Sequence, residues 1–258
     1  MTHDYDAEIA ETLTRCAAQI GTDVPTLRRR ILLAGWSIGH MPSKAERSDW
    51  PAQLDADLAA RETEYQERDE STIHNILRSG PSALASVPSA DLRRRIDRRL
   101  RDLIETYHPM QDGSAVILGP TRVGKSTLCV ELLRQYVPEL SAGLRQWMLD
   151  HGHCVQYQAP SVVWARELDL CNAVTQHPLG KGWPEAVTRA LDAQLLILDD
   201  LGWGSRTDVT ATLAAHRYDS GKCTITTSGY TYEELSQKYS SAIIRTQCTD
   251  GPATGRAG

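Results

Sequence analysis

The order of hydrophobic and polar positions changes near residue 113. From there on, short apolar runs alternate with segments of helical periodicity. This order predicts strands at 114–119, 154–159, 195–200 and 223–228, and helices at about 124–136, 161–174, 207–218 and 231–240. Strands that alternate with helices usually form a mainly parallel sheet whose two faces are covered. We therefore expect an α/β fold, with a three-layer αβα core over residues 113–247.

The segment ahead of this core is predicted to be helical. Residues 26–33 give a short helical pattern that ends near Gly35, and residues 52–79 are strongly helix-forming and charged. Residues 80–88 carry proline near both ends with small residues between them, which is typical of a linker. We interpret residues 1–88 as a helical region that docks a partner. A stabilising extension of the core is the alternative.

An amphipathic helix is predicted directly after the linker. Apolar residues recur there at three- and four-residue spacing, and the other face is rich in arginine. The arginines are Arg93, Arg94, Arg95, Arg98, Arg99 and Arg101. This segment, residues 89–112, either binds the phosphates of DNA or is a solvated face that Asp97 and Asp102 partly compensate. The last residues, 248–258, are rich in Gly and Pro and predict a flexible tail.

Composition and charge narrow the function classes. The chain of 258 residues is 41% hydrophobic and 24% charged, which fits a folded globular protein. Its net charge of −5 gives no overall basic field, so any nucleic-acid contact needs a local patch. No apolar stretch is long enough for a membrane helix, and the acidic N-terminus does not resemble a signal peptide. We expect a cytoplasmic protein with reduced cysteines and no membrane partner.

A phosphate-binding loop is the sharpest feature of the sequence. The pattern G-x-x-x-x-G-K-[ST] is matched after an apolar run and before a helical segment. Its residues are Gly119, Pro120, Thr121, Arg122, Val123, Gly124, Lys125 and Ser126, and Thr127 continues into the helix. Glycines let backbone N–H groups approach phosphates closely, and the helix N-terminus adds partial positive charge. We expect ATP here, with Lys125 on the β- and γ-phosphates and the Ser126 hydroxyl on Mg²⁺.

Two carboxylates follow the apolar run Leu195-Leu196-Ile197-Leu198. Because ligands of open α/β sheets bind at the carboxyl ends of the strands, Asp199 is placed to hold Mg²⁺ directly or through water. Asp200 would then polarise the attacking water. The alternative is that the two aspartates only begin a turn.

A Thr-rich strand at 223–229 offers further polar groups. Thr227 and Ser228 come at its end and are candidates to read the γ-phosphate or its water. Ordinary β-branched strand residues are an equally weighted alternative.

Together these pieces resemble the DnaC/IstB-like ATPases of the AAA+ class of P-loop NTPases, which are helicase loaders and transposition helpers. The resemblance covers about residues 110–245. It rests on GPTRVGKST, the strand beginning at residue 153, LLILDDLG at 195–202, Arg217-Tyr218, and TITTS at 224–228.

The resemblance implies a Mg²⁺-dependent ATPase that couples nucleotide state to the assembly of a partner protein on DNA. The partner would be a replicative helicase or a transposase, and the chain would form nucleotide-dependent homo-oligomers. It also implies that Arg245 reaches the ATP of a neighbouring subunit, although a surface arginine is the alternative. Two departures matter. Gly229 stands where the family usually has Asn, and Arg122-Val123 stand where it often has Gly-Thr.

Two other functions remain open from the sequence. A nucleotide-gated adaptor with little or no turnover is favoured by Gly229 and by the short C-terminal segment, which leaves no room for a helical lid. A small-molecule P-loop kinase is the other, and the paired carboxylates and the Thr-rich strand argue against it.

Overall fold

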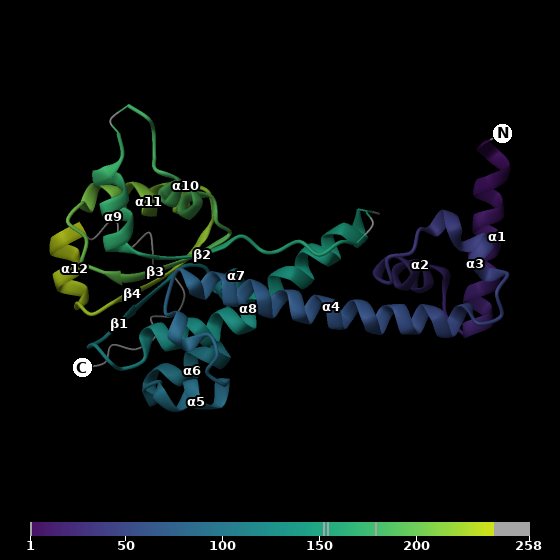
Figure 1. Ribbon diagram of the computed structural model, residues 1–258, viewed down its shortest axis with the longest axis horizontal. Coiled ribbons are helices and arrows are strands. Elements are labelled where there is room, and N and C mark those ends of the chain that lie inside the picture. The colour runs from purple at the N-terminus through teal and green to yellow at the C-terminus, as the bar shows by residue number, and fades with distance from the viewer. Residues whose placement is uncertain (1, 152, 154, 179, 240–258) are drawn as a thin grey trace. The chain divides into compact units, whose positions relative to one another are not determined.

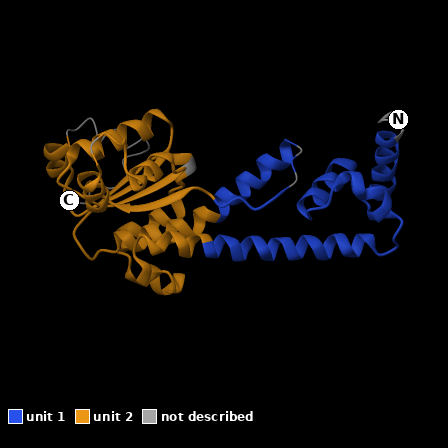
Figure 2. Ribbon diagram, turned by 45° about the horizontal axis from the view of Figure 1, so that its top comes forward, with its two compact units in different colours: residues 1–71, 138–159 blue, residues 72–137, 160–258 orange. Residues whose placement is uncertain are grey.

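The computed structural model describes residues 2–151, 153, 155–178 and 180–239 (Figure 1). The chain divides into two compact units (Figure 2). The first consists of residues 1–71 and 138–159, and the second of residues 72–137 and 160–258. Each unit is therefore built from two separate stretches, whereas the sequence pattern divides the chain into consecutive segments. No helix in the described part of the chain is long and apolar enough to cross a membrane.

The first unit is helical. Its elements are α1 (Thr2–Ile20), α2 (Val24–Leu33), a 3-10 turn at Ile38–His40, α3 (Met41–Ala45), most of α4 (Trp50–Arg78) and the end of α8 (Lys125–Asp150). The predicted helices at 26–33 and 52–79 correspond to α2 and α4. Asp23 begins α2 by accepting a hydrogen bond from the Thr26 backbone N–H at 2.6 Å. Leu27, Ile31 and Trp50 are buried in the core of this unit.

The second unit contains a parallel four-stranded sheet, which confirms the α/β class. The strands are β1 (Ala115–Leu118), β2 (Val162–Arg166), β3 (Leu195–Leu201) and β4 (Cys223–Ser228), in the spatial order β1-β4-β3-β2. The helices are α5 (Ser89–Arg95), α6 (Arg98–Thr106), α7 (Pro109–Asp112), the start of α8, α9 (Glu167–Gln176), α10 (Glu185–Asp192), α11 (Thr207–Asp219) and α12 (Tyr232–Tyr239). Figure 1 shows α9, α10 and α11 on one face of the sheet and α8 on the other.

The second strand lies later in the chain than the sequence predicts. Residues 155–161 contain no strand, and the helix expected at 161–174 begins only at Glu167. Both 154–159 and 162–166 carry residues suited to a strand. The second run pairs with β3, where Val162 and Trp164 are buried. Val155 and Tyr157 instead pack with Tyr65 and Met148 in the first unit.

The arginine-rich segment is two short helices and not one. Ile96 has an extended backbone (φ −90°, ψ 131°), which ends α5. The Asp97 side chain then caps α6 by accepting from the Arg99 backbone N–H at 2.8 Å. The apolar spacing survives the break, because Leu92, Ile96 and Ile104 are all buried.

Arg217, part of the Arg-Tyr pair in the sequence resemblance, is a structural residue. Its side chain is only 1% exposed and donates to the carbonyls of Ala190 (2.8 Å), Ala193 (2.7 Å) and Cys223 and to the Thr224 hydroxyl (2.8 Å). Burial lowers the pKa of this guanidinium to about 10, so it stays charged at neutral pH. Arg217 thereby ties the end of α10 to the start of β4.

Candidate functional site

The phosphate-binding loop connects the carboxyl end of β1 to the N-terminus of α8, as the motif requires. Gly119 and Gly124 have φ of 154° and 91°, conformations that residues with a side chain rarely adopt. Helix α8 begins directly at Lys125. Its first backbone N–H groups lack partners within the helix and are available to an anion.

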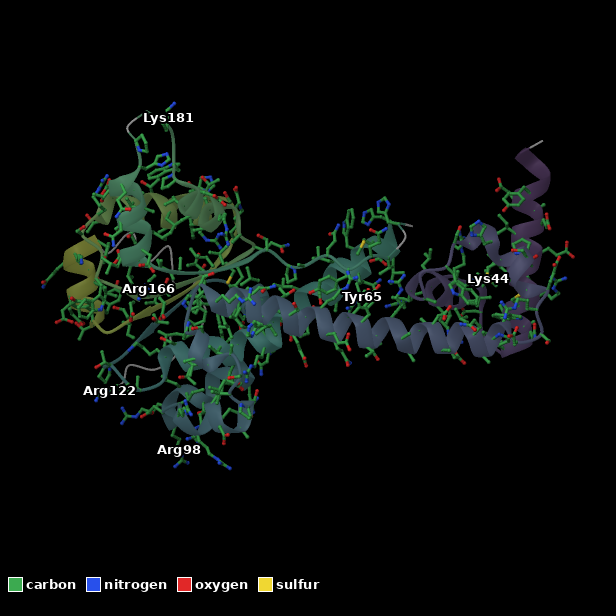
Figure 3. The ribbon with its side chains drawn as sticks, in the orientation of Figure 1. Lys44, Tyr65, Arg98, Arg122, Arg166 and Lys181 are labelled. Carbon is green, nitrogen blue, oxygen red and sulfur yellow. The ribbon has the colours of Figure 1, made fainter. Side chains whose placement is uncertain are left out.

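Arg122 adopts a left-handed conformation in the middle of this loop. Its φ is 71°, which costs a non-glycine residue about 1 kcal/mol or more. A glycine would adopt this conformation without that cost. Arg122 is exposed (Figure 3).

The back of the loop is packed against the junction of α5 and α6. A Cβ at Gly124 would lie 2.7 Å from the Arg95 carbonyl oxygen and 2.8 Å from Ile96 Cα. Beside it, the Asp97 backbone N–H donates to the Val123 carbonyl at 3.0 Å. The width of the loop is thus set in part by the segment that precedes β1.

Gly124→Ala is expected to distort this loop, because the added methyl meets backbone atoms that cannot move aside and φ is positive. We expect ATP affinity to fall at least about tenfold and the melting temperature to drop. Gly143→Ala is the matched control, since Gly143 lies inside α8 with open space around it and should be neutral or stabilising. Equal ATP affinity in the two variants, measured by titration calorimetry, would contradict the role of Gly124.

Lys125 is buried at the start of α8 and is folded onto the loop. Its Nζ donates to the carbonyls of Gly119 at 2.8 Å and Pro120 at 2.9 Å. Burial lowers the pKa of this ammonium, and the nearby Asp200 and Asp199 oppose that shift. The ammonium is therefore held near the carboxylates of Asp199 and Asp200, at the N-terminus of α8.

Ser126 and Asp199 face each other across the end of the sheet. Ser126 Oγ lies 3.1 Å from both Asp199 Oδ1 and Asp199 Oδ2, and Asp199 is 5% exposed. A hydroxyl and a carboxylate are oxygen donors of the kind that Mg²⁺ prefers. The residues present therefore fit the metal that the sequence predicts, and Ser126 and Asp199 are the side chains that would hold it.

Asp200 is exposed beside this pair. It has φ of 58°, a left-handed conformation that Asp tolerates better than most residues. Partial desolvation, followed by the repulsion of Asp199, raises the pKa of this carboxyl, while Lys125 and Arg166 oppose the shift. The local backbone turn thus aims two successive carboxylates differently, one inward to Ser126 and one outward.

The hydroxyls expected to read the γ-phosphate are engaged inside the protein. Thr227 is fully buried, donates to Asp199 Oδ1 at 2.5 Å and accepts from the Asp200 backbone N–H at 3.2 Å. Ser228 Oγ donates to the Leu201 carbonyl at 2.6 Å. Their role toward the phosphate stays a prediction. In the structure Thr227 holds the Asp199 carboxylate and the Asp200 backbone, and Ser228 holds the Leu201 carbonyl. Gly229 lies next to the loop, where a Cβ would be 3.9 Å from Thr121 Cγ2.

Glu167 was not foreseen from the sequence. This buried carboxylate accepts from the backbone N–H groups of Gly202 (2.9 Å) and Gly204 (2.7 Å), and from the hydroxyls of Thr210 and Tyr239, both at 2.6 Å. Lys238 Nζ donates to the carbonyls of the same two glycines. The loop after Asp200 is therefore held on both sides. The sequence pattern predicts a helix at 161–174, and nothing in that pattern distinguishes Glu167 from a glutamate on the surface of the helix.

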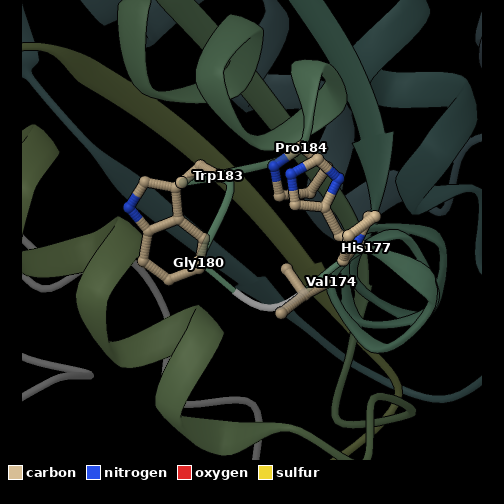
Figure 4. Close-up of a pocket in the computed structure, with 7 residues that line it drawn as sticks. Val174, His177, Gly180, Trp183 and Pro184 are labelled. Atoms are coloured by element: carbon tan, nitrogen blue, oxygen red, sulfur yellow. The ribbon is translucent and has the colours of Figure 1, made fainter.

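Other predicted features lie outside this constellation. Arg245 and the tail at 248–258 lie outside the described residues. A cavity of about 250 Å³ is formed by the end of α9 and the loop that follows it (Figure 4). Its lining contains none of the residues above and consists of Val174, His177, Pro178, Gly180, Gly182, Trp183 and Pro184.

Comparison with known proteins gives matches among solved structures only. No family model matches the sequence, and no curated protein is significantly similar to it. A protein described as a primosome component from Streptococcus pyogenes serotype M3 is 17% identical, with a TM-score of 0.41 over 63% of this chain and 85% of that chain. The DnaC helicase loader is 18% identical, with a TM-score of 0.39 over 57% and 80%. DnaI is 18% identical, with a TM-score of 0.42 over 73% and 100%.

Proposed function

We propose that this chain binds ATP with Mg²⁺ and hydrolyses it. The observation that carries the proposal is the meeting of Ser126 with Asp199 at the N-terminus of α8, beside Lys125 and Asp200. A phosphate-binding loop, a metal-binding pair and a free carboxylate are the parts that phosphoryl transfer to water requires. The proposal rests on these residues and not on the structural matches.

Each residue of the site has a distinct role in the proposed binding and hydrolysis of ATP. The glycines and first N–H groups of α8 hold the phosphates, and Lys125 exchanges its two carbonyl acceptors for phosphate oxygens. Ser126 and Asp199 would hold Mg²⁺, which neutralises charge on the phosphates when bound. Asp200 orients the attacking water and accepts its proton, while Thr227 holds the Asp199 carboxylate and the backbone of Asp200 in place. The water oxygen bonds to the γ-phosphorus as the bond to the ADP oxygen breaks.

We further propose that nucleotide state controls the assembly of a partner protein on DNA, in the manner of a helicase loader or a transposition helper. The motif set supports this role. The side chains of Arg95, Arg98 and Arg99 have no hydrogen bond or ion pair with any other described residue. They are exposed, in the segment whose Asp97 backbone contacts the loop. They are therefore available to phosphates of DNA. Nucleotide-dependent homo-oligomers, with Arg245 acting between subunits, complete the proposal.

A nucleotide-gated adaptor is the second candidate. It is favoured by Gly229, which offers no side chain to the loop, and by the engagement of the Thr227 hydroxyl with Asp199. Such a protein would bind ATP through the same loop and release it unchanged.

Nucleotide binding is tested with Lys125→Ala. Because a charge-assisted contact to phosphate is lost, we expect the affinity for ATP with Mg²⁺ to fall roughly 10- to 100-fold, measured by titration calorimetry. Lys181→Ala is the control, since Lys181 is an exposed lysine on the loop between α9 and α10 (Figure 3). If the unaltered protein binds no ATP, both candidate functions are wrong.

A further inference from the structure

Arg166 stands at the carboxyl end of β2, next to the strand that carries both aspartates. It is the register partner of Asp199 in the parallel pairing of β2 with β3. Neighbouring strands lie about 4.8 Å apart, and residues in register point to the same side of the sheet. An arginine side chain is long enough to cross that spacing. The Arg166 side chain is thus placed to reach the region next to the carboxylates of Asp199 and Asp200.

Among the described residues, few cations lie close enough to the Asp200 carboxylate to contact a phosphate group beside it. Lys125 and Arg166 both lower the pKa of the Asp200 carboxyl, so the two cations lie near it. In the proposed function, Lys125 already contacts the phosphate oxygens. Gly229, at the end of β4, supplies no side chain, and the Thr227 hydroxyl is held by Asp199. Besides Lys125, the strands that flank the site therefore offer the guanidinium of Arg166.

The contact that holds the Arg166 side chain is exposed to solvent. Its ion pair is with Asp169, at 2.8 Å from Nε and 3.1 Å from Nη2, on the first turn of α9. The two side chains are 56% and 49% exposed, and ion pairs of this kind are weak and easily exchanged. A phosphate group carries more negative charge than a carboxylate and accepts the same forked pair of hydrogen bonds.

We propose that Arg166 is a catalytic residue that acts within its own chain, leaving Asp169 when ATP binds and contacting the γ-phosphate. This proposal rests on the proposed ATPase function. During hydrolysis, negative charge grows on the γ-phosphoryl oxygens and on the ADP oxygen that leaves. The guanidinium offsets this charge and transfers no proton, since the proton of the attacking water goes to Asp200. Asp169 holds the guanidinium in the absence of ATP.

The first test compares affinities for ADP and for a non-hydrolysable ATP analogue with Mg²⁺. Arg166→Gln is expected to weaken binding of the ATP analogue about tenfold or more and to leave ADP binding unchanged. Arg206→Gln is the matched control. Arg206 forms the same kind of exposed ion pair, with Asp208 at 2.9 and 2.7 Å, and shows no interaction with Asp199 or Asp200. An unchanged preference for the ATP analogue in Arg166→Gln would overturn the proposal.

The second test separates catalysis from a structural ion pair. Hydrolysis by Arg166→Gln is expected to fall about 10³-fold or more, as when other P-loop NTPases lose their arginine. Asp169→Asn breaks the same ion pair but should retain or raise hydrolysis, because Arg166 is released. Equal losses in the two variants would mean that the pair only stabilises α9.

A mixing experiment decides whether Arg166 acts within its own chain. Equal amounts of Arg166→Gln and Asp200→Asn should recover no hydrolysis, because neither subunit has a complete site. Recovery toward a quarter or more of the unaltered rate would show that Arg166 acts on the site of a neighbouring subunit.

If the unaltered protein binds no ATP, the proposed function itself fails. If it binds ATP and Arg166→Gln binds it equally well, this inference alone fails.

Discussion

Replacing Asp200 by Asn is expected to abolish ATP hydrolysis while ATP still binds. The amide keeps the size of the side chain but cannot take a proton from water, and loss of a general base lowers a rate about 10²- to 10⁴-fold. Binding should survive because the loop, Lys125, Ser126 and Asp199 are unchanged. The measurement is single-turnover hydrolysis at saturating ATP, together with the ATP affinity of the same preparation.

Asp192→Asn is the control for this variant. Asp192 is 71% exposed at the end of α10, and its contact is with Lys222 at 3.8 Å. Its replacement should leave both hydrolysis and binding unchanged. Undiminished hydrolysis by Asp200→Asn would remove Asp200 from the mechanism. No hydrolysis by the unaltered protein, even with partner and DNA present, would favour the adaptor instead.

Asp200→Asn also provides the best bait for the partner, since it should stay loaded with ATP. A replicative helicase recovered with it would indicate a loader, and a transposase would indicate a transposition helper.

Glu167→Ala is expected to lower the free energy of unfolding by about 3 kcal/mol or more. The substitution leaves four buried donors without their acceptor, and each such group costs about 1–3 kcal/mol. The loop at Gly202 and Gly204 then loses one of its two anchors. Burial, followed by the hydrogen bond to Glu167, raises the pKa of the Tyr239 hydroxyl, so this group stays a protonated donor that needs an acceptor. Chemical denaturation followed by circular dichroism measures the change.

Glu185→Ala provides the comparison, since Glu185 is an exposed residue in the first turn of α10. Its loss should change the free energy of unfolding by less than about 0.5 kcal/mol. A similarly small change for Glu167→Ala would show that Lys238 holds the loop without help.

The parts of the fold that depend on local chemistry could be predicted from the sequence. The phosphate-binding loop combines a strand, two glycines and a helix start within a dozen residues, and β3 is a continuous apolar run that ends in two carboxylates. Both lie where expected. Strand β2 was displaced because two neighbouring runs have similar strand propensity. Which of the two runs forms the strand depends on pairing with β3, and the strand propensity of single residues does not predict that pairing.

The remaining site residues depend on tertiary contacts. Arg166 and Glu167 are consecutive, yet one is an exposed cation and the other a buried acceptor for four donors. The residue types alone give no sign of that difference, because arginine and glutamate are usually exposed. The break between α5 and α6 is similar, because the apolar spacing continues through it and only the extended backbone of Ile96 ends the helix.

The position of Lys125 has a consequence for the energetics of nucleotide binding. Its ammonium donates to the carbonyls of Gly119 and Pro120, so the loop itself supplies acceptors for this charge. Binding of a nucleotide must exchange these hydrogen bonds and cannot simply add new ones. The measured affinity will therefore report the difference between two sets of contacts to one cation. Substitutions that loosen the carbonyls from Lys125 could tighten ATP binding without touching ATP at all.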